Sequence, residues 1–345
     1  MRSIRQTAIL LCLGLLLAAP AASARLPEAA PEVEAFAAQV AARHGLAPED
    51  ISRILAQAKN LEQLIRPKFQ YSAEATWPWH RYRKNFLSPS RVKNGLKFWN
   101  AHADLFERAE KRFGISQAVL AAIVGVETNY GKRPGKIRVL DSLYTQAFHY
   151  PERRRFGRAQ LEDFLVLALK EGLDPLGVKG SYAGAMGQPQ FIPSSYRAYA
   201  VDFDGDGRRD LWNSEADVVG SVANYFALHG WRAGEPVAAP ASGVTQRHRA
   251  LVTGENTKPR PPSLKIADLR AAGIRISDDL AADQLASLIR LSTPGGSDYW
   301  VGLHNFYVIT RYNHSNLYAM AVYQLSREIL ALRENSKGGS MPGER

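Results

Sequence analysis

The chain has 345 residues, of which 46% are hydrophobic, and a formal net charge of +11 at pH 7. This length is ample for a large hydrophobic core, and the single cysteine, Cys12, excludes a fold held together by disulfides and a cysteine-ligated zinc site. The excess of positive charge favours an anionic partner, although the same charge also serves ordinary solubility.

The first 24 residues have the pattern of a secretory signal peptide. Arg2 and Arg5 precede an apolar run over residues 8–19, and residues 22–24 are the small residues of a cleavage site. The apolar run is shorter than the roughly 20 residues that span a bilayer, and the residues before the cysteine lack the small residue of a lipoprotein processing site. We therefore predict cleavage after Ala24 and a soluble periplasmic protein with no transmembrane segment.

Apolar residues recur at helical spacing through most of the remaining chain. Short helices are expected in residues 31–66, and a longer one over residues 92–112. The next helix begins after Ser116, a candidate N-cap, and is apolar almost all round, so it should be buried. Further helices are predicted at residues 139–149, 158–171, 215–229 and 316–332.

The composition changes between residues 233 and 297, where six prolines and short β-branched runs predict strands and one helix near residues 266–272. This segment is expected to form a small inserted α/β module. The predicted organisation is a signal peptide (1–24), an N-terminal helical region (25–113), a core (114–232) with a loop at 202–217, the module (233–297), the C-terminal part of the core (298–333) and a disordered tail (334–345).

Glu127 is the first candidate for chemistry, because it lies at the end of the apolar helix. Burial disfavours the ionised carboxyl, and the negative end of the helix dipole acts in the same direction, so both should raise its pKa. A carboxyl that stays protonated near neutral pH can protonate a glycosidic oxygen. The local sequence also fits a surface glutamate in a last helical turn, or one paired with an arginine.

A glycine-rich stretch at residues 180–196 is the second candidate. Its small residues let backbone approach a ligand closely, its hydroxyl and amide groups can bind sugar hydroxyls and N-acetyl groups, and its aromatic rings can stack on sugars. The composition suits a saccharide cleft. It also fits a packed loop rich in turns.

An aspartate-rich loop over residues 202–213 places carboxylates at positions 1, 3 and 5 and a glycine at position 6, which matches the first half of an EF-hand. Position 12 lacks the expected glutamate, so the closing ligand must come from a longer loop. A solvated loop of Asx-turns without metal is the alternative. The predicted ligands of a structural calcium ion are Asp202, Asp204, Asp206, Arg208 and Asp217, with Glu215 as the alternative to Asp217.

These segments occur in one order and with separations that resemble the lytic murein transglycosylase B family. The resemblance runs through residues 79–86, Val126-Glu127-Thr128, and residues 180–196, 202–231 and 305–315, and it is weak at 25–64 and in the module. It implies a lysozyme-like helical core. The expected fold class is therefore mainly α (α+β), with an additional N-terminal helical region and a small β-containing module.

The resemblance implies an enzyme that cleaves the β-1,4 bond between N-acetylmuramic acid and N-acetylglucosamine in peptidoglycan. The muramoyl O6 closes on C1 and leaves a 1,6-anhydromuramoyl end, with Glu127 acting first as acid and then as base. Substrate assistance by the N-acetyl group can replace the second carboxylate of ordinary glycosidases, and no obvious second acid accompanies Glu127. The chemistry requires no cofactor.

The resemblance also assigns cleft positions. Ser181 and Asn313 are expected to hold the N-acetyl group, and Tyr82 and Tyr318 to position and shield the reacting sugar, although each could be ordinary packing. Two departures from the family pattern are Gln188-Pro189, where better-known members have Tyr-Gly, and Glu152, which leaves Arg153 and Arg154 as candidates for wall-peptide carboxylates. The predicted substrate-binding residues are Tyr82, Ser181, Gln190, Phe191, Asn313 and Tyr318.

Peptidoglycan strands are the expected partner, together with cell-wall synthesis proteins, and nucleic acid is not expected. Two rival functions remain open from the sequence. One is a hydrolytic muramidase that admits water to the same cleft, and the other is a non-catalytic peptidoglycan-binding scaffold. The eight histidines form no zinc pattern and no phosphate-binding loop is present, so other chemistries find little support.

Overall fold

The computed structural model describes residues 30–71 and 73–338, and in them the chain is mainly helical, which confirms the predicted fold class. The predicted signal peptide lies outside these residues. No helix among the described residues is both long enough and apolar enough to cross a membrane.

The helices are α1 (Pro31–His44), α2 (Pro48–Leu55), α3 (Glu62–Gln70), α4 (Ala73–Thr76), α5 (Trp79–Tyr82), α6 (Pro89–Ala101), α7 (Ala103–Phe113), α8 (Gln117–Thr128), α9 (Val139–Phe148), α10 (Arg154–Glu171), α11 (Pro193–Tyr199), α12 (Glu215–Leu228), α13 (Ile266–Ala271), α14 (His304–Tyr312) and α15 (Asn316–Gly338), with short 3-10 helices at Arg83–Asn85, Pro151–Arg153 and Gln246–Leu251. The strands are β1 (Ile137–Arg138), β2 (Lys179–Gly180), β3 (Ala238–Ser242), β4 (Val252–Gly254), β5 (Leu264–Lys265), β6 (Arg275–Ile276), β7 (Leu285–Thr293) and β8 (Gly296–Gly302).

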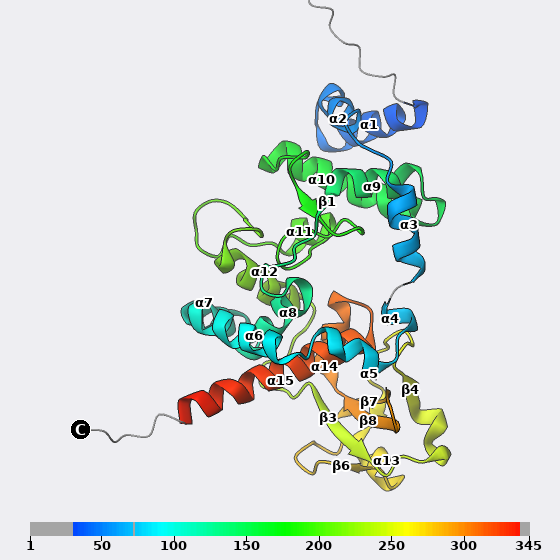
Figure 1. Ribbon diagram of the computed structural model, residues 1–345, viewed down its shortest axis with the longest axis vertical. Coiled ribbons are helices and arrows are strands. Elements are labelled where there is room, and N and C mark those ends of the chain that lie inside the picture. Colours follow the sequence, from blue (N-terminus) through cyan, green and yellow to red (C-terminus); the bar gives the residue numbers. More distant parts are fainter. Residues whose placement is uncertain (1–29, 72, 339–345) are drawn as a thin grey trace, which may run out of the picture.

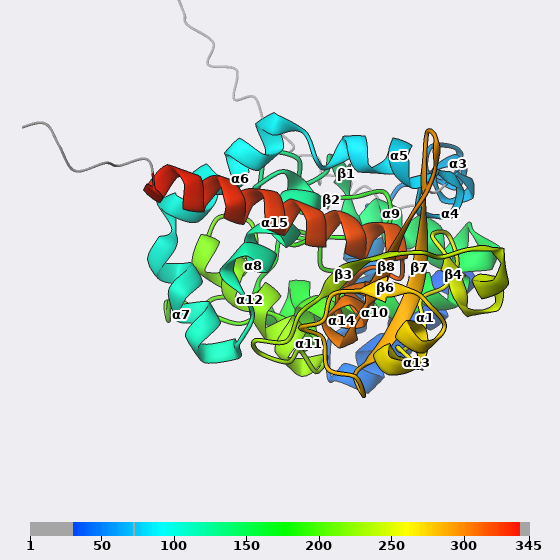
Figure 2. The ribbon, with the colours of Figure 1, turned by 90° about the horizontal axis from the view of Figure 1, so that it is seen from below.

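The molecule is elongated, with α1 and α2 at one end, the larger β-sheet at the other, and the remaining helices between them (Figure 1). Helix α8 lies in the middle, where it packs against α6, α7, α12 and α15. Seen from below, α15 crosses beside α6 and α8, so the last helix of the chain covers the central one (Figure 2).

Helix α8 forms where its sequence predicts. The Ser116 hydroxyl accepts a hydrogen bond from the Val119 N–H (3.4 Å) as N-cap, and the helix is buried from Ala118 to Val126. It ends at two successive residues with left-handed backbone, Asn129 (φ 53°) and Tyr130 (φ 60°). This end of the helix is therefore fixed inside the core and not frayed into solvent.

The helix predicted over residues 92–112 is wrong in one respect, because it is two helices. Helix α6 ends at Ala101 and α7 begins at Ala103, with His102 between them at φ −127°. The break has a tertiary cause. Helix α6 packs on α8 and α15 while α7 packs on α12, so the chain must change direction at this point.

The sequence predicts a disordered tail from residue 334. That starting point is wrong, because residues 334–338 belong to helix α15. The Arg333 guanidinium lies 4.0 Å from the ring centroid of Trp99 on α6, and this cation–π contact anchors the last turns of the helix. Residues 339–345 lie outside the described residues.

Strands β3 to β8 occupy the segment in which the sequence predicts a β-containing module. The strand order is β4-β7-β8-β3-β6, with β5 also paired to β7, and β7 and β8 form an antiparallel hairpin. Helix α13 and the sheet share a small separate core that includes Ile266, Leu269, Leu288 and Val301. The boundaries of the predicted domains stay a prediction.

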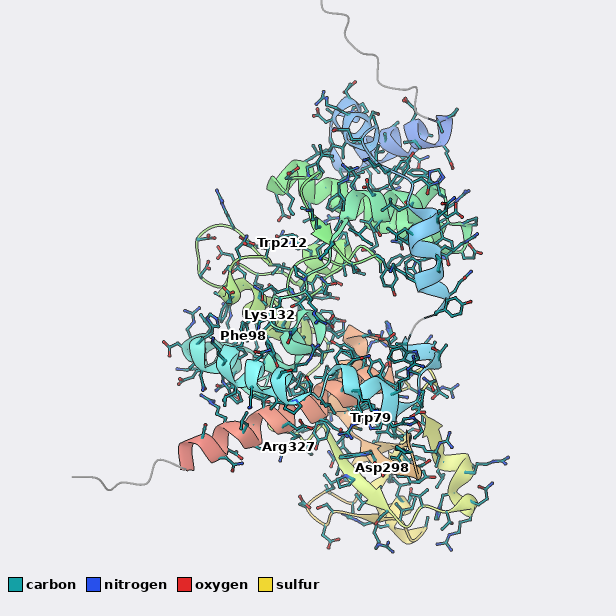
Figure 3. The ribbon with its side chains drawn as sticks, viewed as in Figure 1. Trp79, Phe98, Lys132, Trp212, Asp298 and Arg327 are labelled. Atoms are coloured by element: carbon teal, nitrogen blue, oxygen red, sulfur yellow. The ribbon has the colours of Figure 1, made fainter. Side chains whose placement is uncertain are left out.

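Helix α5 joins this sheet to the helical part of the molecule, and Figure 3 labels Trp79 at the start of that helix. The Trp79 N–H donates to Glu255 Oε2 (3.2 Å) and to Ser292 Oγ (3.2 Å). Glu255 is 8% exposed and also accepts from the Ser292 N–H (2.8 Å). A buried carboxylate that accepts several hydrogen bonds holds α5 firmly to the sheet, because removing one partner would leave the other buried groups without hydrogen bonds.

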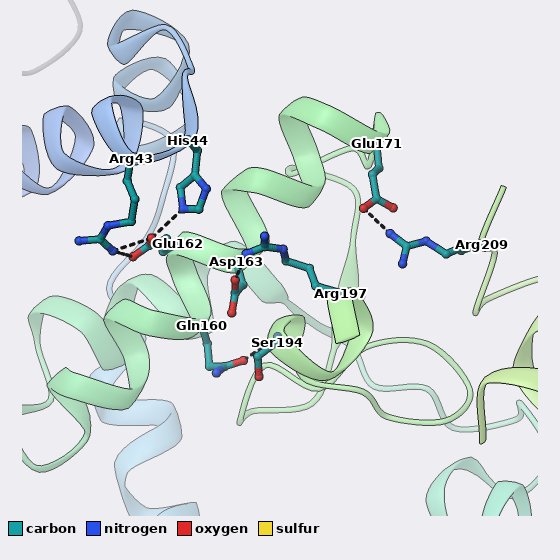
Figure 4. A network of polar contacts seen from close by, with 9 residues as sticks. All are labelled: Arg43, His44, Gln160, Glu162, Asp163, Glu171, Ser194, Arg197 and Arg209. Atoms are coloured by element: carbon teal, nitrogen blue, oxygen red, sulfur yellow. Dashed lines mark hydrogen bonds and ion pairs between the residues drawn. The ribbon is translucent and has the colours of Figure 1, made fainter. Parts of the chain in front are cut away.

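Polar contacts tie other elements to α10 (Figure 4). Glu162 accepts hydrogen bonds from Arg43 (2.6 Å) and His44 (2.7 Å) at the end of α1, and Gln160 accepts from the Ser194 N–H (3.1 Å) at the start of α11. Exposed ion pairs add only about 0–1 kcal/mol each, so these contacts orient elements more than they stabilise them. Further ion pairs join Asp163 to Arg197 and Glu171 to Arg209.

Candidate active site

Glu127 is the penultimate residue of α8 and its side chain is only partly exposed. The Tyr318 hydroxyl, from α15, donates a hydrogen bond to Glu127 Oε1 at 2.5 Å. Tyr318 is itself 2% exposed, so the contact is shielded from water. The two residues are 191 positions apart in the sequence, and the packing of α15 on α8 brings them together.

The electrostatic environment raises the pKa of Glu127 from its ordinary value of 4.5 to about 7. Burial of the carboxyl is the largest cause. The hydrogen bond from Tyr318 favours the ionised form and lowers the pKa, whereas the negative charge of Glu74 raises it. The carboxyl is therefore mostly protonated below pH 7, as the apolar helix predicts.

Three tyrosines interact electrostatically with this carboxyl. Tyr82 is 1% exposed, and burial together with the charges of Glu74 and Glu127 raises its pKa. Burial and the charge of Glu127 likewise raise the pKa values of Tyr312 and Tyr318, whose rings stack with centroids 6.3 Å apart. All three phenols therefore stay neutral and act as hydrogen-bond donors beside Glu127.

The end of α8 is fastened to the glycine-rich loop. The Thr128 hydroxyl donates to the Gln188 carbonyl (3.0 Å) and accepts from the Gly131 N–H (3.0 Å). The Tyr312 hydroxyl, from α14, donates to the Pro189 carbonyl (2.6 Å). The loop and Glu127 thus keep a fixed relative position.

Within that loop, the polar residues predicted to bind substrate also hold the backbone in shape. The Ser181 hydroxyl accepts from the Ala183 N–H (3.2 Å) and the Ala185 N–H (3.1 Å). Gln190 has left-handed backbone (φ 53°), and its amide donates to the carbonyls of Pro134 (3.1 Å) and Gly187 (2.9 Å). Both side chains remain partly exposed, so their roles toward substrate stay predictions.

Phe191 and Asn313 have contrasting environments. Phe191 is 2% exposed and packs against Tyr225 and Tyr312. It therefore supports Tyr312 from within the core and offers no surface to a sugar. Asn313, which follows α14, is partly exposed, and its side-chain amide makes no hydrogen bond in the part of the chain that the structure describes. Such an amide remains available to a ligand.

Two residues of this site are missed by the sequence. Tyr312 lies in a family motif but has no local feature that separates it from a core tyrosine. Glu74 lies in the four-residue helix α4, and its charge acts on Glu127. The expectation that no second acid takes part beside Glu127 stays a prediction, and the charge of Glu74, 53 positions earlier in the chain, acts on Glu127 only by raising its pKa.

The aspartate loop gathers three of its predicted ligands. Carboxylate oxygens of Asp202, Asp204 and Asp217 all lie within 4.8 Å of one another. Asp217 is 1% exposed, and burial raises its pKa, as do the charges of Asp204 and Asp202, while hydrogen bonds from backbone N–H groups lower it. Asp206 does not belong to this group of three, and it accepts a hydrogen bond from the N–H of Arg208 (2.8 Å).

Comparisons with known proteins agree on one family. The family profile described as Transglycosylase SLT domain matches residues 28–327. Membrane-bound lytic murein transglycosylase B of Escherichia coli (strain K12) is 43% identical in an alignment of 311 residues that covers 88% of this chain and 84% of that protein.

Solved structures are similar over the same span. Soluble lytic transglycosylase SltB1 from Pseudomonas aeruginosa has a TM-score of 0.82 and 44% identity, covering 88% of this chain and 100% of that one. The Escherichia coli lytic transglycosylase Slt35 in complex with calcium has a TM-score of 0.79 and 44% identity, covering 88% and 94%.

Proposed function

The chain belongs to the transglycosylase SLT family, and on that premise we propose that Glu127 is the single acid and base of the family's reaction. The chain is a lytic transglycosylase, which cleaves the glycan strands of peptidoglycan and leaves 1,6-anhydromuramoyl ends. The observation that carries the role of Glu127 is its partly buried carboxyl, hydrogen-bonded by Tyr318, with a pKa raised to about 7.

The two steps of the reaction need only one carboxyl. Glu127 first donates its proton to the glycosidic oxygen, and the bond from that oxygen to C1 of the muramoyl sugar breaks while the N-acetyl oxygen supports C1. The Glu127 carboxylate then takes the proton of the O6 hydroxyl as O6 bonds to C1. The proton lost in the first step is regained in the second, and no water is consumed.

The residues around Glu127 stabilise its charge and position the substrate. Tyr318 stabilises the carboxylate between the two steps, because its hydroxyl donates to Glu127. Ser181 and Asn313 hold the N-acetyl group, and Gln190 shapes the pocket around the sugar, while Tyr82, which is buried, supports that pocket from within the core. Phe191 acts indirectly, by supporting Tyr312.

The proposed acid predicts a pH dependence. The value of kcat/KM should fall as pH rises through about 7, because Glu127 loses the proton that it must donate. Replacing Tyr318 with phenylalanine removes a hydrogen bond that favours the ionised form, so this basic limb should move to higher pH. Release of soluble fragments from purified sacculi between pH 5 and 9 measures both effects. If the fall in kcat/KM of the Tyr318→Phe enzyme occurs at the wild-type pH or at a lower pH, the assignment is wrong.

We also propose that the aspartate loop binds a structural calcium ion. Carboxylate oxygens are the ligands that calcium prefers, and three of them converge here, with Asp217 buried beneath Asp202 and Asp204. A cation would relieve the repulsion among the three charges. The ion would hold the loop to the start of α12, which carries Asp217, and would supply no chemistry to the reaction.

Calcium should therefore raise the melting temperature. At a concentration 100-fold above Kd, binding to the folded state alone adds about 2.7 kcal/mol, or roughly 5 °C for a chain of this size. Differential scanning calorimetry in calcium and in chelator measures this change. Asp202→Asn should abolish it, whereas Asp104→Asn on the exposed side of α7 should not, and equal melting of the wild type in both buffers would refute the site.

The periplasm is the proposed location, because the substrate lies there and residues 1–24 have the pattern of a signal peptide. The net positive charge suits a polyanionic wall. Cell-wall synthesis proteins are the proposed protein partners.

A further inference from the structure

One turn of the module contacts the helix that carries Tyr318. The side-chain amide of Asn316, the first residue of α15, donates to the carbonyls of Gly254 (3.3 Å) and Thr257 (3.3 Å). Asn316 is 3% exposed, so water cannot readily replace these two acceptors. A buried donor that loses its partners costs free energy, and the two contacts therefore fix the place where α15 begins.

Residues 254–257, which we call the module turn, are themselves held in place. The carboxylate of Glu255 is buried and accepts from the backbone N–H groups of Trp79 (3.2 Å) and Ser292 (2.8 Å). The Asn256 amide donates to two backbone carbonyls around the end of α4 (2.9 and 3.1 Å). Because the module turn is bound both to the sheet and to the helical segment beside it, it can serve as a fixed anchor.

The anchored residue is two positions from the hydrogen-bond donor of the active site. Tyr318 follows Asn316 in the first turn of α15, and its hydroxyl donates to Glu127 Oε1 at 2.5 Å. The Tyr318 N–H donates to Ser315 Oγ (3.2 Å), and its ring stacks on Tyr312 with centroids 6.3 Å apart. A displaced start of α15 would therefore displace the Tyr318 hydroxyl, and a hydrogen bond weakens as its length and angle depart from the optimum.

We propose that Asn316 is a positioning residue of this active site, which anchors the start of α15 to the module turn and so holds the Tyr318 hydroxyl on the Glu127 carboxyl. The inference rests on the proposed roles of Glu127 and Tyr318. Asn316 acts through Tyr318 and exchanges no proton with the sugar. The module, whose small core is separate from that of the helices, thereby gains a defined part in the reaction.

Loss of the anchor should act in the same direction as loss of the Tyr318 hydroxyl. The hydrogen bond from Tyr318 favours the ionised form of Glu127 and lowers its pKa, in opposition to burial. Asn316→Leu keeps the approximate size of the side chain and adds no charge, but it cannot donate to the module turn. The other titratable groups that act on Glu127 are unchanged in this variant: Glu74, Tyr82 and Tyr312.

The test is the pH dependence of kcat/KM for the enzyme acting on purified sacculi. Asn316→Leu should move the fall in kcat/KM up by about half a pH unit, in the same direction as Tyr318→Phe. In the Tyr318→Phe background the same change should move it no further, because no hydroxyl is left to be held. Asn305→Leu is the matched control, since this buried amide also donates to two backbone carbonyls, those of Arg232 (2.8 Å) and Glu235 (3.0 Å) in the loop between α12 and β3. It should lower the melting temperature and leave the fall in kcat/KM at the wild-type pH.

Titration of the Glu127 carboxyl by carbon-13 NMR is a second measurement that needs no turnover, and it should show the same upward shift. If Asn316→Leu does not fold, Asn316→Ala removes the amide without placing a bulky apolar group beside the two carbonyls. A folded Asn316 variant whose pH profile and titration match the wild type, while Tyr318→Phe shifts both, overturns the inference alone. A shift of equal size with and without the Tyr318 hydroxyl also overturns it, since the effect would then not pass through Tyr318. An unshifted Tyr318→Phe enzyme, or full activity of Glu127→Gln, would instead refute the proposed function.

Discussion

Replacing Glu127 with glutamine should lower the rate of glycan cleavage by about 10³-fold or more. The amide keeps the size of the carboxyl and can accept the hydrogen bond from Tyr318, but it has no proton to donate to the leaving oxygen and cannot take one from O6. Both steps of the reaction depend on the same group, so no other residue compensates. Chromatography of soluble anhydro-fragments released from purified sacculi gives the rate.

Binding separates this effect from misfolding. Glu127→Gln should still sediment with sacculi, because the residues proposed to contact the sugar are unchanged. It should also melt at or above the wild-type temperature at pH 8. The raised pKa of Glu127 means that the folded state binds more protons than the unfolded state between about pH 4.5 and 7, so the ionised carboxyl destabilises the fold above pH 7. Retained cleavage by a folded Glu127→Gln enzyme would disprove the acid–base assignment.

Replacing Phe226 with alanine should destabilise the protein by about 3–5 kcal/mol. Phe226 on α12 is fully buried, and its ring stacks on Tyr312 with centroids 5.6 Å apart and meets Trp231 at 5.8 Å. Truncation leaves a cavity beneath Tyr312, one of the tyrosines near Glu127. The melting temperature should fall by roughly 10 °C, and kcat should fall as well because Tyr312 loses its support.

Phe226→Leu is the matched control, since it retains most of the buried volume and should cost less than about 1.5 kcal/mol. Thermal and urea unfolding followed by circular dichroism compare the two variants. A Phe226→Ala enzyme that melts within about 2 °C of the wild type would show that this part of the core can collapse around the missing ring.

The role of the module follows from its contacts more than from its composition. From the sequence, prolines and β-branched runs predict a small inserted α/β module. In the structure, Glu255 and Asn256 bind the segment from Glu74 to Trp79, and Gly254 binds Asn316 at the base of α15. The module therefore braces two walls of the active site.

The sequence by itself determined three features: the mainly helical fold class, the central apolar helix, and the upward shift of the Glu127 pKa. Each of these depends on local information. The Ser116 cap and the run from Ala118 to Val126 specify a helix that must be buried on every side, and a carboxyl at its end must share that burial. Motif order then identified the family, and with it the reaction.

Only the tertiary structure decided which groups meet Glu127. Tyr318 is distant from Glu127 in sequence, and its position depends on how α15 packs on α8, which no local pattern encodes. The break at His102 also has a tertiary origin. The helix before it, α6, packs on α8 and α15, whereas the helix after it, α7, packs on α12. Side-chain chemistry can be read along the chain, but the electrostatic environment of a carboxyl depends on charges and hydrogen bonds across space, and these exist only once the helices are assembled.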